Sequence, residues 1–351
     1  MAISNYQPVT GPKSARVRAR GSMRKLLFGL AGAIAASLLP GVSWGQTGTA
    51  QSLVAMRALD QRVATIGHRL AVANLDLCSQ RMNQPGFAVH DLSQYGAEFR
   101  AAAIAAFGLD AGPGVLALVP GSPAEQGGLR LDDVLLSVDG QSLAGAGPQR
   151  SRTFDRMAEI LDTLETAFTD GSAEIEVRRA GARRSLHIGS EPGCVTRFQL
   201  IPSRRLNAQA DGRYVQVTTA IADYVADDDE LAAVIAHEFA HNVLGHRARL
   251  DRAHVSRGFF ANFGNNATRI RETEAEADRF SVYLLDRAGY DAEAAVRFWA
   301  RFGRRGLNFL GSPTHPNWQR RIALIETEIA AIRAARAQGR VPVPPLSAPA
   351  G

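Results

Sequence analysis

Apolar residues recur every three or four positions in several stretches of the chain, which is the spacing of helices with one buried face. The longest stretch covers residues 56–77, and a second covers residues 154–168. A third helix is expected to begin at Asp227, which stands three positions before Glu230 in the spacing of a capping box. Further helices are expected at residues 268–288, 292–302 and 316–337.

Short apolar runs bounded by glycine, proline and aspartate predict β-strands between and after these helices. Turn sequences such as Pro120-Gly121-Ser122-Pro123 and Asp139-Gly140 separate the runs in the middle of the chain. Strands are expected at residues 114–119, 133–138, 174–179, 184–188, 198–201 and 213–219. The pattern predicts an α+β fold, in which a β-rich domain precedes a mostly helical domain with a small sheet.

Composition agrees with this predicted fold and argues against a nucleic-acid partner. A chain of 351 residues suggests two domains with terminal segments, and 46% hydrophobic residues are typical of a soluble globular core. The pI near 9.8 would suit nucleic-acid binding. However, the excess of positive charge lies within the first 25 residues, and no acid precedes Asp60. The rest of the chain is balanced, so we expect no nucleic-acid partner.

Residues 1–45 have the layout of a secretory signal peptide, with Met23 as an alternative start. A basic head is followed by an apolar run at residues 26–39, then by Pro40 and small residues. This run is shorter than the roughly 20 residues that cross a bilayer. We therefore expect export, to a periplasm, and no stable membrane span in the mature chain. Retention of the segment as an N-terminal membrane anchor is the alternative.

The two cysteines of the chain, Cys78 and Cys194, are far apart in sequence, and neither has a second cysteine nearby that would suggest a metal site. In an oxidising compartment we expect them to form a disulfide, with two free thiols as the alternative.

Residues 237–241 read His-Glu-Phe-Ala-His, and this pentapeptide indicates a metal site. On a helix, His237 and His241 share one face and can bind one ion together. Glu238 is then placed to take a proton from a water on that ion. This is the pattern of a zinc hydrolase.

A catalytic zinc takes three protein ligands, so one more is needed. His246 lies about 140° from His241 on an uninterrupted helix, and we expect it to point away. Leu244 and Arg247 stand where the metzincin pattern requires Gly and His, which excludes that class. Within the next predicted helix, Glu274 can complete the ligand set, and Asp278 can orient a ligand imidazole.

The spaced motifs His-Glu-x-x-His and Glu-x-x-Ala-Asp resemble the HtpX and CAAX-prenyl-protease type of zinc metallopeptidases, the gluzincins of peptidase family M48. Asn207-Ala208, residues 229–232, residues 314–316 and Arg321-Ile322 agree with that family. The resemblance implies one zinc per chain, held by His237, His241 and Glu274, with Glu238 as general base. It also implies that His315 lies near the zinc and stabilises the oxyanion. The likeness covers residues 195–337, with 47–84 as an N-terminal helix of the same domain.

The string GSPAEQGGLRLDDVLLSVDG resembles a PDZ domain of the kind associated with bacterial proteases, and the likeness covers residues 97–190. Asp132 departs from the glycine usual before Asp133. The resemblance implies a groove for C-terminal peptides, whose carboxylate-binding loop would lie at Phe107, Gly108 and Leu109. A spacer that binds nothing is the alternative. The tail, residues 338–351, is rich in proline and predicted to be disordered.

Together these observations predict an exported zinc endopeptidase for unfolded or misassembled proteins, with the PDZ domain delivering or gating substrate. Substrate is expected to lie extended along the strand at residues 213–218. One alternative is a non-proteolytic chaperone or adaptor with a structural zinc, but such a site would not need Glu238. Another is an intramembrane site-two protease, which is disfavoured because aspartates begin the motif helix and arginines follow it.

Overall fold

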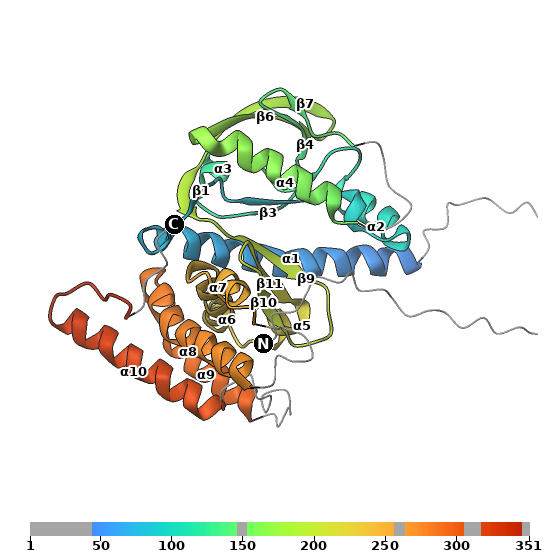
Figure 1. Cartoon of the computed structure of the whole chain (residues 1–351). Coiled ribbons are helices and arrows are strands. Elements are labelled where there is room, and N and C mark those ends of the chain that lie inside the picture. Colours follow the sequence, from blue (N-terminus) through green and yellow to red (C-terminus); the bar gives the residue numbers. More distant parts are fainter. Residues whose placement is uncertain (1–43, 146–152, 256–263, 305–316, 346–351) are drawn as a thin grey trace, which may run out of the picture.

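The computed structural model describes residues 44–145, 153–255, 264–304 and 317–345. Helix α1 (Trp44–Ala73) crosses the middle of the molecule, with most of the β-strands on one side and the C-terminal helices on the other (Figure 1). We call residues 81–194 the sheet region and residues 195–345 the helical region. The predicted α+β fold is confirmed.

The sheet region is built on an antiparallel sheet with strand order β2-β3-β4-β6-β7, in which a short strand β5 also pairs with β4. Its strands are β2 (Phe87–His90), β3 (Gly114–Leu118), β4 (Val134–Val138), β5 (Gln141–Ser142), β6 (Ser172–Arg179) and β7 (Ala182–Gly189). Its helices are α2 (Ala97–Phe107), α3 (Pro123–Gln126) and α4 (Asp155–Ala167), with 3-10 turns η2 (Leu92–Gln94) and η3 (Phe168–Asp170). Edge strand β2 and helix α2 were not among the predicted elements, and β2 precedes the boundary expected at residue 97.

The core of the sheet region lies between this sheet and α4, because alternate strand residues and one stripe of α4 are apolar. Ile160 and Leu164 of α4 are buried against Leu135 and Ile175. The unusual Asp132 adopts a left-handed backbone, with φ of 64°, so an aspartate occupies here a conformation that favours glycine. The departure from the family pattern therefore leaves the turn intact.

The helical region begins with a three-stranded sheet of order β10-β11-β9, formed by β9 (Arg197–Ile201), β10 (Ala208–Ala210) and β11 (Tyr214–Thr218). The helices described after it are α5 (Thr219–Tyr224), α6 (Asp228–Val243), α7 (His246–Arg252), α8 (Gly264–Arg287), α9 (Glu293–Gly303) and α10 (Trp318–Ala337). The expectation that substrate pairs with residues 213–218 is not supported, because β11 is central and both its edges are already hydrogen-bonded.

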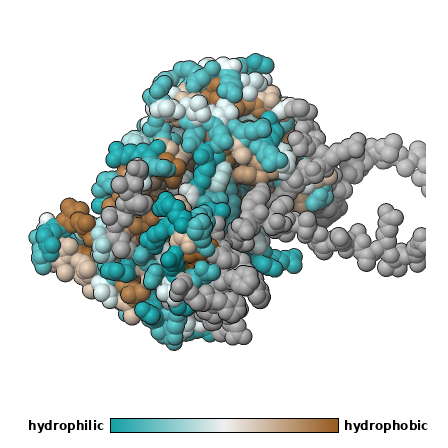
Figure 2. Space-filling view, viewed as in Figure 1, coloured by the Kyte–Doolittle hydropathy of each residue, from teal (hydrophilic) through white to brown (hydrophobic). Residues whose placement is uncertain are grey.

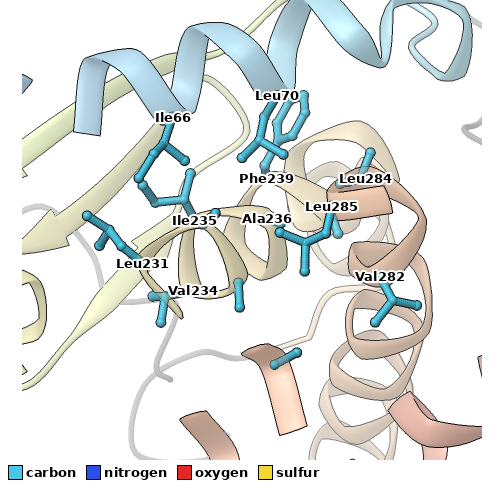
Figure 3. Packing of buried hydrophobic residues seen from close by; sticks show 14 of the residues in the cluster. Ile66, Leu70, Leu231, Val234, Ile235, Ala236, Phe239, Val282, Leu284 and Leu285 are labelled. Carbon is cyan, nitrogen blue, oxygen red and sulfur yellow. The ribbon is translucent and has the colours of Figure 1, made fainter. Parts of the chain in front are cut away.

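Helix α6 lies at the centre of the main core and is buried nearly all round, polar residues included. Ile66 and Leu70 of α1 pack on one side of it, and Leu284 and Leu285 of α8 pack on another (Figure 3). At its beginning, the Asp227 carboxylate accepts a hydrogen bond from the Glu230 backbone N–H at 2.8 Å. The packing fixes α6 against α1 and α8, and thereby fixes the side chains that these helices carry.

The two regions are joined at several points. Strand β1 (Arg81–Gln84) pairs with β8 (Glu191–Cys194), and after the turn η1 (Leu75–Leu77) a disulfide links Cys78 to Cys194. Arg197 and Arg213 of the helical region both bind the carboxylates of Asp162 and Glu165 on α4. The two regions are therefore held together by the disulfide beside β8 and by ion pairs along α4.

The face of the molecule in Figure 2 is mainly hydrophilic, with hydrophobic residues in separate patches. No described helix is both long enough and apolar enough to cross a lipid bilayer.

Candidate functional site

The predicted metal ligands come together between α6 and α8. His237 and His241, one turn apart on α6, have their Nε2 atoms 3.3 Å apart. Glu274 of α8 brings its carboxylate oxygens to 3.5 Å from each Nε2 atom. All three side chains are buried, and together they form a group able to hold a metal ion.

The donor set and its spacing fit zinc. A tetrahedral zinc with ligands at about 2.0–2.1 Å holds those atoms about 3.3–3.4 Å from one another, close to the separations seen here. Two imidazole nitrogens and a carboxylate oxygen are also the donor types of catalytic zinc sites. In addition, Glu274 Oε2 is buried without a hydrogen-bond partner among the described residues, which leaves an oxygen for a cation.

Asp278 and Arg321 surround the first histidine. Asp278 Oδ1 lies 3.1 Å from His237 Nδ1, the ring nitrogen that faces away from the cluster. Arg321 of α10 donates to both Asp278 oxygens, at 2.6 and 2.7 Å, and its guanidinium lies 3.6 Å from the ring centroid of Trp299. Burial and Arg321 lower the pKa of His237, but the neighbouring carboxylates of Asp278 and Glu274 outweigh them and raise it to about 9. A metal must therefore displace a proton from this ring.

Glu238 follows the first ligand on the buried helix α6. Burial raises the pKa of its carboxyl to about 7. Its Oε1 atom is buried and has no hydrogen-bond partner among the described residues. This carboxyl can hold or release a proton near neutral pH, as a general base must.

His246 does not join the metal ligands, as expected, but the reason differs from the one expected. Helix α6 ends at Val243, and Gly245, with φ of 61°, turns the chain into α7. The ring of His246 therefore turns back, and its Nδ1 lies 2.8 Å from His241 Nδ1 while its Nε2 lies 3.0 Å from Glu276. His246 therefore orients the imidazole of His241 through its Nδ1 atom, as Asp278 orients that of His237.

The residues expected to bind a peptide carboxylate, Phe107, Gly108 and Leu109, do not line the groove of the sheet region. Phe107 and Leu109 are buried against Leu53 of α1, and Gly108 caps α2, its N–H donating to Ile104. The structure instead has a groove of about 530 Å³ along β2 and α4, and none of the three residues lines it. The other predicted catalytic residue, His315, lies outside the described residues.

Comparison with known proteins assigns the two regions. Residues 175–270 and 260–329 match the sequence model of Peptidase family M48, and residues 114–179 match that of the PDZ domain. The mitochondrial metalloendopeptidase OMA1 of Schizosaccharomyces pombe is 32% identical over 137 residues, which cover 33% of this chain and 41% of that protein. OMA1 of Saccharomyces cerevisiae is 24% identical over 188 residues, which cover 46% of this chain and 52% of that protein.

The chain thus spans about half or less of the length of these curated relatives. Among solved structures, the crystal structure of the HtrA3 PDZ domain bound to a phage-derived ligand, FGRWV, covers 32% of this chain and 89% of that one. Its identity is 19% and its TM-score is 0.24. By the sequence matches, the chain carries a peptidase family M48 domain together with a PDZ domain.

Proposed function

We propose that the protein is a zinc-dependent endopeptidase that hydrolyses peptide bonds in extended segments of unfolded or misassembled proteins. One observation carries the proposal: the donor atoms of His237, His241 and Glu274 have the mutual spacing of zinc ligands. Directly after the first of them on the same helix stands Glu238, whose Oε1 has no hydrogen-bond partner among the described residues. A structural zinc site would have no use for that carboxyl.

Each residue of the site is proposed to have a separate role in peptide-bond hydrolysis. A zinc ion held by the two histidines and Glu274 would lower the pKa of a water molecule and polarise the scissile carbonyl. Glu238 takes the proton of the attacking water and then gives it to the leaving nitrogen, and its pKa of about 7 suits both transfers. Asp278 and His246 keep the two imidazoles oriented through their far ring nitrogens. Stabilisation of the oxyanion by His315 is part of the proposal and rests on the family resemblance.

Substrate is proposed to lie along β10 rather than β11. Within the described residues, β10 pairs only with β11, so its outer edge is available for an added strand. Because β10 packs on α6, a peptide on that edge would pass close to the metal ligands. Backbone pairing reads little side-chain identity, which suits a peptidase acting on unfolded chains. The PDZ groove is proposed to bind such chains and deliver them.

Export is also part of the proposal. It is supported by the basic and apolar layout of residues 1–45 and by the disulfide between Cys78 and Cys194, since disulfides persist in oxidising compartments. Peptide mapping of protein recovered from cell fractions would test both the cleavage of the segment and the pairing of the cysteines.

The test of the activity is metal analysis with a casein cleavage assay on the wild-type chain and on Glu238→Gln. We expect one zinc per chain in both proteins and a loss of cleavage of about 10²–10⁴-fold in the variant. Normal turnover by the variant would contradict the proposal. Zinc binding without turnover in the wild-type chain would instead favour the adaptor function.

A further inference from the structure

The groove of the sheet region is lined by several segments, and two of them, a face of α1 and residues 196–202, come from outside the sheet region. The free edge of β2 forms the first wall, and α4 forms the second through Met157, Leu161 and Leu164. The third is a face of α1, whose lining residues are Thr49, Ser52, Leu53, Met56, Asp60, Val63, Ala64 and His68. Figure 1 shows α1 passing beneath the sheet and α4.

Helix α1 runs along the whole of β2, in the opposite direction. At one end His68 lies beside Gly86, just before β2 begins: a Cβ on that glycine would lie 3.3 Å from the ring. At the other end Arg57 lies over the ring of Phe107, which packs on His90, the last residue of β2. Between them, side-chain hydrogen bonds of Gln61 to both backbone groups of Leu118 hold the helix against the sheet. The wall is therefore fixed.

Asp60 lies between these two ends, half-buried in the groove lining, and its charge acts on the neighbouring hydroxyl of Tyr95. Burial raises the pKa of its carboxyl to about 7, and the structure gives it no hydrogen bond or ion pair among the described residues. The nearby arginines are already paired: Arg57 with Asp132, and Arg62 with Asp228. The groove thus holds a carboxylate whose counter-ion the described protein does not supply.

We propose that Asp60 selects a peptide with a lysine or arginine side chain, bound as an added strand along β2. The added strand would run between β2 and α4, where its alternate side chains point toward the α1 wall. A cation beside Asp60 would favour its ionised form, whereas a neutral side chain would leave a carboxyl in apolar surroundings. A second carboxylate in the ligand would be repelled. The proposal deepens the proposed function, since it names the class of chain that the PDZ groove would deliver.

Binding can be measured separately from cleavage. The probes are fluorescein-labelled octapeptides of alternating valine and serine with a free carboxyl terminus. Lysine, and in a parallel set the uncharged norleucine, replaces one residue at each position in turn. Anisotropy is measured with the full chain carrying Glu238→Gln, so that no peptide is cut. We expect lysine at one position to bind at least about 10-fold more tightly than norleucine.

That preference should vanish when Asp60→Asn is added and should be kept when Asp228→Asn is added. Asp228 is exposed and outside the groove lining, so this control removes one carboxylate without changing the groove. Equal binding of the lysine and norleucine peptides, or a lysine preference that survives Asp60→Asn, would overturn the proposal. Absence of binding by every peptide would also overturn it, while the casein assay would still report separately on the peptidase function.

Discussion

The metal centre and the groove differ in how their carboxylates are paired. At the metal centre, Asp278 contacts both Arg321 and His237, and Glu274 lies beside two imidazoles. The carboxyl of Asp60 in the groove has no such partner among the described residues. A network of paired polar groups holds its geometry before any ligand arrives, whereas a desolvated carboxyl without a partner is stabilised only when a ligand completes it. This difference suits the metal centre to catalysis and the groove to the choice of a bound peptide.

Arg321→Met gives the largest test of this comparison. It leaves Asp278 and Glu274 buried without their cation, so we expect the free energy of unfolding to fall by about 3–5 kcal/mol. Urea denaturation measures the change. Arg320→Met, at the exposed neighbouring position, is the matched control and should stay within about 0.5 kcal/mol of the wild type. Equal effects of the two substitutions would show that the metal centre does not depend on this charge network.

Removal of the disulfide tests whether the two regions are stabilised separately. Cys78 and Cys194 are 116 positions apart, and a crosslink of that span is worth about 2–5 kcal/mol, chiefly through the unfolded chain. We expect Cys78→Ser combined with Cys194→Ser to lower the unfolding free energy by that amount and to leave zinc affinity unchanged. A large fall in zinc affinity, measured by chelator competition, would show that the metal centre depends on the junction.

His246→Phe tests how far the network behind the ligands controls the metal. The substitution removes the contact with His241 Nδ1, and we expect zinc affinity to fall about 10–100-fold. His187→Phe provides the control, because His187 is 67% exposed and lies in the sheet region. If both variants bound zinc as tightly as the wild type, the orienting role of His246 would be refuted.

Asp60→Asn has the smallest expected effect. It should raise the free energy of unfolding, whereas the substitution at Arg321 in the metal centre should lower it. The pKa of Asp60 is raised from 3.8 to about 7 in the folded protein, so ionisation disfavours folding increasingly as the pH rises from about 4 to 7. We expect the variant to be more stable than the wild type by about 1–3 kcal/mol at pH 8 and equally stable below pH 4. Unfolding curves at both pH values provide the check, and a destabilised variant at pH 8 would contradict the assignment.

The metal ligands could be predicted because local rules place them. His237 and His241 share a helix face by their spacing alone, and Glu274 lies on the next long helix. The buried position of Arg321 could not be predicted this way, since it depends on how α10 packs against α6 and α8. The sequence does contain one signal for it: Arg321 stands four residues before Ile325, on the stripe of α10 that is buried. A charge on an apolar stripe favours a buried partner.

The groove could not be located from sequence, because its walls come from several segments that lie far apart in the chain. Strand β2 has only four residues, too few for a clear alternating pattern, and the apolar face of α1 has the same spacing as a simple core helix. The glycine at Gly108 suggested a binding loop, but its left-handed backbone, with φ of 64°, ends a helix instead. Likewise, the central position of β11 in the sheet β10-β11-β9 depends on strand pairing, which composition does not reveal.

The pairing of β1 with β8 gives the PDZ segment the character of an exchangeable module. The chain enters the sheet region just after Cys78 and leaves it at Cys194, and the Cα atoms of these two residues are only 5.6 Å apart. That gap is shorter than two consecutive steps of about 3.8 Å between Cα atoms. A single bridging residue could close it without rerouting the peptidase chain. The host domain could therefore lose the module, or carry a different one, while α1 and α6 keep their places.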